Sequence, residues 1–127
     1  MEPYNIASVG VGAAFGAWLR WFLGLRLNPV FPTVPLGTLA ANLIGGLLVG
    51  VAVAYFDRHP QMDPAWRLFV ITGFMGGLTT FSTFSSEVVS LMLRHEFAWA
   101  LATASVHLFG SLALTAAGIA LVAMATR

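Results

Sequence analysis

Apolar residues dominate four long stretches of the chain, residues 6–25, 36–56, 68–93 and 97–125. A helix needs about 20 apolar residues to cross the hydrocarbon core of a bilayer, which is about 30 Å thick. Each stretch is long enough, and the last is long enough to require tilt or extension beyond the bilayer. The pattern predicts an all-α integral membrane protein, residues 1–127, with four transmembrane helices in one domain.

The connections between these stretches are short. Three prolines interrupt residues 28–35, so this segment cannot be helical throughout. Residues 57–64 form the one clearly aqueous loop, and residues 94–96 make a minimal third connection. No basic segment precedes the first apolar stretch, so we expect that stretch to be a retained helix and not a cleaved signal peptide.

Composition supports a membrane location and excludes several functions. The chain is 58% hydrophobic and 9% charged, whereas about 25% of a soluble domain is charged. Six arginines and five acidic residues nearly balance, so nothing indicates nucleic-acid binding. The chain has no cysteine, no paired carboxylates and no histidine cluster with ligand spacing. We therefore expect no disulfide, no thiolate metal site and no enzyme activity.

The charges do not fix an orientation in the membrane. Cytoplasmic loops normally carry an excess of Arg and Lys. With four spans, one side holds Arg58, Arg67 and Arg127, and the other holds Arg26 and Arg94, with Arg20 able to snorkel towards it. Either other features set a single orientation, or the chain inserts both ways and pairs as an antiparallel homodimer.

Small residues follow helical faces in the first two stretches. They recur four positions apart in three sets, which are Gly12, Gly16 and Gly24 (with Arg20 between them), Gly37, Ala41 and Gly45, and Asn42, Gly46 and Gly50. Such faces let helices approach closely in lipid, within one subunit or between subunits. Because four helices of this length enclose little interior, we favour an oligomer.

The third stretch contains a poor helix centre, Gly76-Gly77 followed by Thr79-Thr80. A break there would free backbone groups that need partners inside the protein or in a water-filled cavity. Freed carbonyls near the midplane are the usual ligands of a cation. An intact helix whose hydroxyls bond to carbonyls one turn earlier explains the same residues equally well.

Two phenylalanines, Phe81 and Phe84, share a helical face after this point, interleaved with the hydroxyls of Ser82, Thr83, Ser85 and Ser86. Phenylalanine pairs in membrane helices usually serve packing. The edge of a phenyl ring is electropositive, however, so an anion can lie against it. Hydroxyl donors beside such edges would suit an anion that has lost its water.

The fourth stretch places Thr103, His107, Ser111 and Thr115 on one face, which indicates either a helix–helix seam or a pore lining. We interpret His107 as a packing residue and not as a proton relay. Asn42 is the only amide within the four stretches, and it serves either to join helices or to donate to a permeating anion. Arg20 and Glu87 lie towards the ends of their spans, where either could flank a pore mouth.

Three segments of the chain resemble the Fluc (CrcB) family of small fluoride ion channels. Residues 73–85, GFMGGLTTFSTFS, closely resemble the family signature. Residues 16–21, GAWLRW, and residues 37–45, GTLAANLIG, are similar to its first-helix and second-helix motifs. The match covers all four stretches in order.

The resemblance implies a dual-topology, antiparallel homodimer in the plasma (inner) membrane, with a broken third helix and two separate fluoride pathways. It implies that Phe81 and Phe84 line each pathway, that Asn42 donates to fluoride, and that hydroxyls come from Ser82, Thr83, Ser111 and Thr115. Arg20 matches the residue at the pore mouth. A structural sodium ion on the dimer axis would be bound by the backbone carbonyls of Gly76 and Thr79. The expected activity is passive export of cytoplasmic fluoride down its electrochemical gradient.

Two other functions compete with a channel. A small multidrug antiporter also uses four short helices, but proton-coupled antiport of cations needs a carboxylate deep in the membrane. The first, second and fourth stretches contain none, and Glu87 lies late in the third. A purely structural membrane subunit would explain the glycine faces but not the polar ones.

Overall fold

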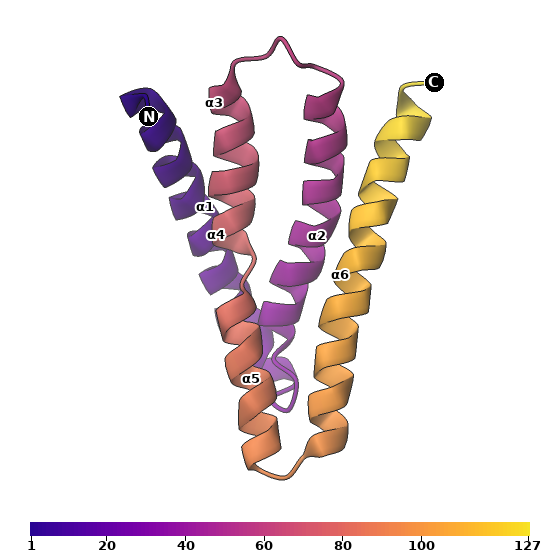
Figure 1. Ribbon diagram of the computed structural model, residues 1–127. Helices are drawn as coiled ribbons and strands as arrows, with labels where there is room; N and C mark the ends of the chain where they lie inside the picture. Colours follow the sequence, from indigo (N-terminus) through magenta and orange to yellow (C-terminus); the bar gives the residue numbers. More distant parts are fainter.

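The four apolar stretches form four long helices in the structure, a computed structural model that describes residues 1–127. Four helical segments are long and apolar enough to cross a membrane, Pro3–Val30, Leu36–Asp57, Pro64–Leu93 and Phe97–Ala125. The chain contains no strand. The predicted all-α class with four spans is therefore confirmed, and both termini lie at the same end of the molecule (Figure 1).

The first connection is organised by one side chain. Helix α1, Pro3–Leu27, starts with a proline at its first position and continues into the short 3-10 turn η1, Asn28–Val30. The Asn28 side-chain oxygen accepts the N–H groups of Gly37 and Thr38, at 2.8 and 3.3 Å. These are two of the unpaired donors at the start of α2, Leu36–Asp57, so Asn28 acts as its cap from outside the helix.

The third span is built from four segments. It starts with α3, Pro64–Arg67, where Asp63 accepts the N–H of Ala65, and it continues through the π-helical η2, Leu68–Met75, and α4, Gly76–Leu78. Thr79 and Thr80 then have extended backbone (φ −87°, ψ 152° and φ −147°, ψ 115°) before α5, Phe81–Leu93. We call these two residues the extended pair.

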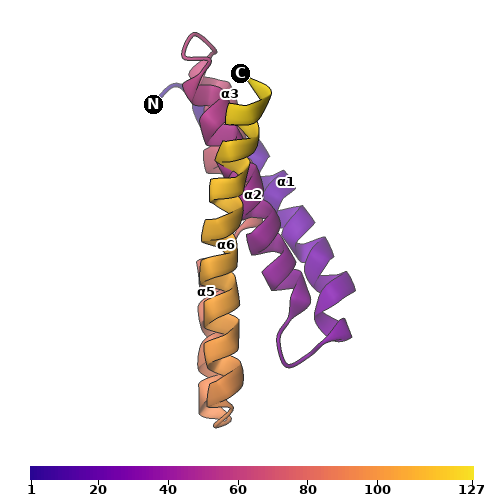
Figure 2. The ribbon, with the colours of Figure 1, turned by 90° about the vertical axis from the view of Figure 1, so that its right-hand side faces the viewer.

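A tight turn joins α5 to α6, Phe97–Ala125. His95 has a left-handed backbone with φ 59°, and the Glu96 N–H donates to the Leu91 carbonyl at 2.9 Å. This arrangement closes the end of α5 and reverses the chain within three residues. As a result α5 and α6 run side by side in opposite directions, away from the lower ends of α1 and α2 (Figure 2).

Glycines bring the helices together within one subunit. A Cβ on Gly16 would overlap the Phe74 carbonyl of η2, and one on Gly50 would overlap the Thr115 carbonyl of α6. The glycine faces of α1 and α2 therefore pack against the third and fourth spans of the same chain. Helix α6 lies along α2, while α1 lies along η2 and α4.

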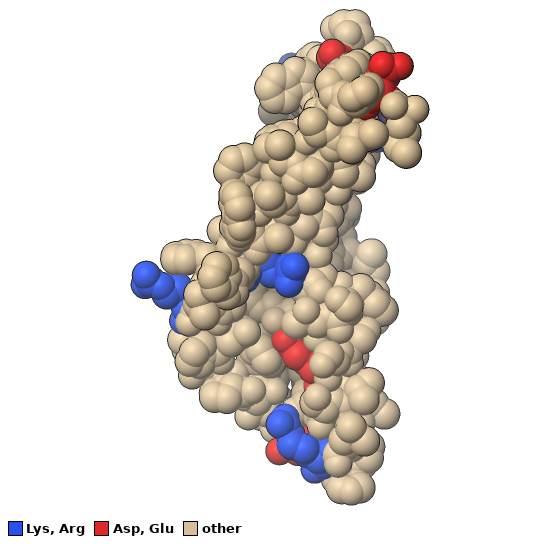
Figure 3. Space-filling view, turned by 90° about the vertical axis from the view of Figure 1, so that its left-hand side faces the viewer, with Lys and Arg blue, Asp and Glu red and all other residues tan.

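Little of the surface is hidden inside the single chain. Only 19 of 127 residues are buried, and large apolar side chains are exposed on every long helix. In Figure 3 the charged side chains gather at the upper end and in the lower half, and an uncharged band lies between them. Such a surface requires the apolar interior of a bilayer, or other protein subunits, around it.

Candidate functional site

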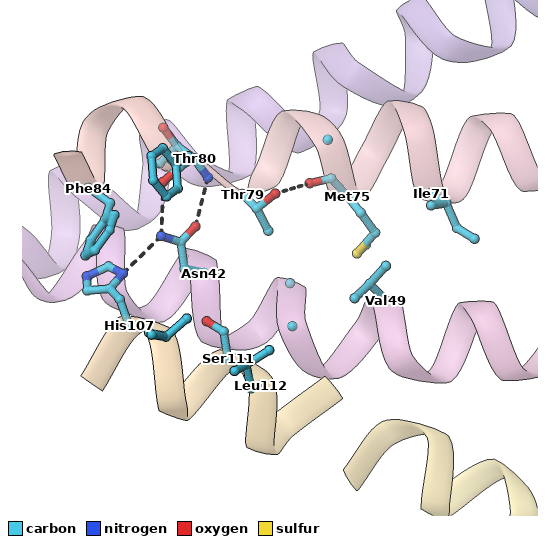
Figure 4. Close-up of a pocket in the computed structure, with 15 residues that line it drawn as sticks. Asn42, Val49, Ile71, Met75, Thr79, Thr80, Phe84, His107, Ser111 and Leu112 are labelled. Atoms are coloured by element: carbon cyan, nitrogen blue, oxygen red, sulfur yellow. Dashed lines mark hydrogen bonds between the residues drawn. The ribbon is translucent and has the colours of Figure 1, made fainter. Parts of the chain in front are cut away.

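A cavity of about 470 Å³ lies between α2, the third span and α6, beside the extended pair (Figure 4). Its polar lining comes from an amide, an imidazole and hydroxyl groups, and two phenyl rings join them. No Asp, Glu, Arg or Lys lines it. These lining residues are Asn42, Thr79, Thr80, Ser111, His107, Phe81 and Phe84, with glycine and aliphatic residues around them.

The second residue of the extended pair, Thr80, takes its backbone hydrogen bonds from outside the third span. In a continuous helix the N–H of Thr80 would donate to the carbonyl of Gly76. Here that N–H donates to Asn42 Oδ1 at 2.8 Å, and Asn42 Nδ2 donates to the Thr80 carbonyl at 3.1 Å. Asn42 thus pairs with both backbone groups of one residue, which satisfies them in a region where water is scarce.

The helix that follows the pair is capped by the same threonine. The Thr83 N–H, which in a continuous helix would donate to the Thr79 carbonyl, donates to Thr80 Oγ1 at 3.1 Å. The carbonyls of Gly76 and Thr79 have therefore both lost their usual helical donors. Both residues also line the cavity.

The side chain of Arg20 reaches the opposite side of the third span. Its Nε donates to the Gly77 carbonyl at 3.0 Å, the group that the N–H of Phe81 would serve in a continuous helix. Arg20 lines a second hollow of about 290 Å³, together with Thr38, Thr80 and Thr83. Arg20 and Thr83 do not line the larger cavity, and Thr80 is the residue that lines both hollows.

The two phenylalanines lie at one end of the cavity. Their ring centroids are 5.6 Å apart with an interplanar angle of 64°, an edge-to-face pair. Phe81 is 78% exposed in the single chain. Phe84 also lies against the His107 ring, with centroids 4.6 Å apart.

The polar face of α6 divides among different environments. His107 and Ser111 line the cavity, whereas Thr115 Oγ1 lies 2.9 Å from both the Gly46 and Ser111 carbonyls and can donate to either. Thr103 is fully buried, and its hydroxyl has no partner in the chain. The Thr115 end of this face therefore packs against α2, and the middle of the face lines the cavity. Both interpretations of the spacing, a helix–helix seam and a pore lining, thus apply to different parts of the face.

The remaining residues predicted from the sequence are less closely connected to the larger cavity. Ser82 is exposed, and its hydroxyl lies 3.3 Å from that of Thr80. Glu87 accepts a hydrogen bond from the Thr38 hydroxyl at 2.6 Å, while its second oxygen is buried without a partner. No group of three His, Cys, Asp or Glu side chains could hold a metal.

Two lining residues, Thr80 and His107, have no role at the fluoride pathway in the predictions from the sequence, although Thr80 lies in the predicted helix break and His107 on the polar face of the fourth stretch. Thr80 gave no signal beyond its weak helix propensity. His107 gave a clear one, since it lies four positions from Ser111 on the same face. A packing role was the simpler interpretation of a single histidine in an apolar helix.

Known proteins similar to this chain cover nearly its whole length. Residues 7–119 match the family described as CrcB-like protein, Camphor Resistance (CrcB). A protein of Cupriavidus metallidurans named fluoride-specific ion channel FluC is 56% identical over 119 residues, 94% of each chain. Proteins of the same name from Nitrosospira multiformis and Dechloromonas aromatica are 57% and 61% identical over 94% of this chain and 93% and 88% of their own.

Proposed function

Since the chain belongs to the CrcB-like family, we propose that it is a fluoride-specific ion channel that lets fluoride leave the cytoplasm passively. Membership of this family confirms the resemblance drawn from the three sequence motifs. Relatives named as ion channels also agree with the expectation that the chain is not an enzyme. Its four spans make it a multi-pass protein of the plasma membrane.

The observation that supports anion conduction best is the chemistry of the cavity lining. Fluoride is small and strongly hydrated, so a narrow pathway must replace its water with hydrogen-bond donors. An amide, several hydroxyls and two phenyl rings line the cavity, and no cationic side chain does. A fixed positive charge would hold the ion, whereas neutral donors allow it to leave.

Each proposed pathway residue has a role that its position supports. Phe81 and Phe84 line the cavity as an edge-to-face pair, and Asn42 and Ser111 provide donors along its wall. Thr83 and Arg20 serve the second hollow, which makes that hollow a candidate mouth. Ser82 and Thr115 do not line the cavity, but their hydroxyls lie beside the lining residues Thr80 and Ser111.

The active form in this proposal is an antiparallel homodimer of dual topology with two pathways. The near balance of arginines between the two sides supports insertion in both orientations. Phe81, with 78% of its surface exposed at the cavity's end, supports a partner there. A ring so placed would complete the wall of a pathway once a second subunit covers it.

We further propose a structural sodium ion on the dimer axis, and the groups present fit one. Sodium in a membrane protein is commonly held by carbonyls of unwound backbone. The Gly76 and Thr79 carbonyls have lost their helical donors to Asn42 Oδ1 and Thr80 Oγ1. Two copies of each, from the two subunits, would provide four neutral oxygen ligands.

Fluoride efflux from liposomes tests the channel. Vesicles containing the purified protein are loaded with potassium fluoride, and valinomycin supplies the balancing potassium flux. We expect rapid fluoride release and retention of chloride in parallel vesicles. Fluoride that stays inside when valinomycin is present would overturn the proposal, and a proton-coupled drug substrate would then be tested.

Two further measurements test the role of Phe81 in the pathway and the proposed sodium ion on the dimer axis. Phe81→Ile should lower fluoride flux strongly, while Phe109→Ile, on an exposed ring of α6 outside the cavity, should leave it unchanged. Wild-type flux in a correctly assembled Phe81→Ile dimer would refute the role of Phe81. Replacing all sodium by N-methylglucamine should weaken the dimer, and unchanged stability and flux would exclude the axial ion.

A further inference from the structure

One buried side chain joins two of the proposed pathway residues and has no role in the function proposed above. His107 on α6 is only 4% exposed. Its Nδ1 lies 3.0 Å from Asn42 Nδ2, and its ring lies against Phe84 with centroids 4.6 Å apart (Figure 4). An imidazole nitrogen can donate or accept, so the meaning of this contact depends on which atom carries the hydrogen.

The orientation of the Asn42 amide is fixed by the backbone of Thr80. An N–H group can only donate and a carbonyl can only accept. The Thr80 N–H lies 2.8 Å from one atom of the Asn42 amide, which must therefore be the oxygen. The Thr80 carbonyl lies 3.1 Å from the other atom, which must be the nitrogen. The two amide positions cannot be exchanged without opposing donor to donor and acceptor to acceptor.

This orientation determines the form of His107. Asn42 Nδ2 carries two hydrogens, of which one points to the Thr80 carbonyl and the other to His107. Nδ1 must then accept, so the ring is neutral and its hydrogen lies on Nε2, which is buried without a partner in the chain. With a hydrogen on Nδ1, in the other tautomer or in the imidazolium, two donors would face each other at 3.0 Å.

We propose that His107, as the neutral Nε2–H tautomer, is a positioning residue that holds the Asn42 amide at the fluoride pathway. The inference rests on the proposed channel function. Both hydrogens of the amide are engaged, so an ion that approaches Asn42 must take one from an existing bond. The bond to Thr80 holds the backbone of the extended pair, and the bond to His107 joins two side chains. The His107 bond opens to the ion and re-forms when the ion leaves.

Contact with Phe84 restrains the ring from its other side. The imidazole packs against the phenyl ring with a tilt of 38°, so Phe84 limits the rotation of the His107 ring. His107 thereby couples the orientation of the amide donor to that of one phenyl ring. The sequence alone places these three residues on three different spans.

Nitrogen NMR of isotope-labelled histidine tests the tautomer independently of flux. The other two histidines lie outside the cavity and are replaced as His59→Gln and His95→Asn, the latter because asparagine tolerates the left-handed backbone at that position. We expect an unprotonated, hydrogen-bonded Nδ1 and a protonated Nε2. In Asn42→Asp, whose carboxylate can only accept, the hydrogen should move to Nδ1. A protonated Nδ1 in the wild type would overturn the inference.

A matched pair of variants tests the positioning role. Asn and Leu at position 107 have the same branched side-chain skeleton. Only His107→Asn provides a hydrogen-bond acceptor, Oδ1, at the same number of bonds from the backbone as Nδ1 of histidine. We expect His107→Asn to keep fluoride flux near the wild-type value and His107→Leu to lower it roughly tenfold, the effect of one lost hydrogen bond. Equal flux in the two variants, at equal amounts of folded protein, would overturn the role.

The two proposals fail in distinguishable ways. A wild-type protein that conducts fluoride but carries its hydrogen on Nδ1 refutes the inference on His107 alone. A wild-type protein with the expected tautomer but no fluoride flux refutes the proposed function and, with it, the positioning role. Should His107→Leu fail to fold, two measurements still decide whether the inference on His107 holds. These are the tautomer found by nitrogen NMR and the fluoride flux of His107→Asn.

Discussion

Replacing Asn42 by Leu should destabilise the folded chain, because it removes the contacts that satisfy the extended pair. Leu has the same branched side-chain skeleton as Asn but neither donates nor accepts. The change deletes the bonds to the Thr80 N–H at 2.8 Å, to the Thr80 carbonyl at 3.1 Å and to His107 at 3.0 Å. Little cavity is left, so the effect reports mainly on hydrogen bonding.

The magnitude follows from these three bonds. Interhelical hydrogen bonds in a membrane protein average about 0.6 kcal/mol, so three of them amount to roughly 2 kcal/mol. The substitution also leaves the Thr80 N–H without an acceptor, and a part-buried donor in that state adds about 1 kcal/mol or more. We therefore expect Asn42→Leu to lower the free energy of unfolding by about 3 kcal/mol.

Unfolding by SDS in mixed micelles, followed by tryptophan fluorescence, measures this change. Ile44→Leu is the matched control, since Ile44 lies two positions along α2 with 40% of its surface exposed and should be insensitive. Asn42→Asp keeps the acceptor for the Thr80 N–H and should fall between wild type and Asn42→Leu. A loss below about 0.5 kcal/mol in Asn42→Leu would refute the reasoning, because it is smaller than one average bond.

Three other substitutions probe packing and the second hollow by the same titration. Gly50→Ala should cost about 1–3 kcal/mol, because its Cβ would overlap the Thr115 carbonyl. Gly10→Ala, where a Cβ meets nothing within 4 Å, should instead stabilise α1 by up to about 1 kcal/mol, and equal effects at the two glycines would contradict the packing described. Arg20→Gln should cost about 1–2 kcal/mol through loss of the charged donor to the Gly77 carbonyl, whereas a neutral effect would show that this bond does not form.

The spans were predictable because they depend on local composition. Apolar length alone located the four helices, and the prolines of residues 28–35 indicated where a connection lies. The four-residue spacing on α6 likewise placed His107 and Ser111 on one face. Such patterns carry over to the structure because a helix fixes which side chains share a face.

Partners across helices were not predictable from the same patterns. Asn42 and Thr80 are 38 positions apart, and no periodicity says that an amide on one span will pair with a backbone on another. The same holds for Arg20, whose place near the end of its span suggested a pore mouth but not a bond to the Gly77 carbonyl. These contacts depend on the register between helices, which hydrophobic patterns leave open.

The pairing of Asn42 with Thr80 has a consequence for the order in which the protein is made. A membrane helix that enters lipid alone must satisfy its own backbone, so the third span is expected to insert as a continuous helix. Its backbone at Thr79 and Thr80 can open only after α2 lies alongside and offers the Asn42 amide. Biogenesis would then have two stages. Straight helices first insert into the bilayer, and the backbone of the third span later opens there. Asn42→Leu, which destabilises the opened third span, would favour the straight helix of the first stage.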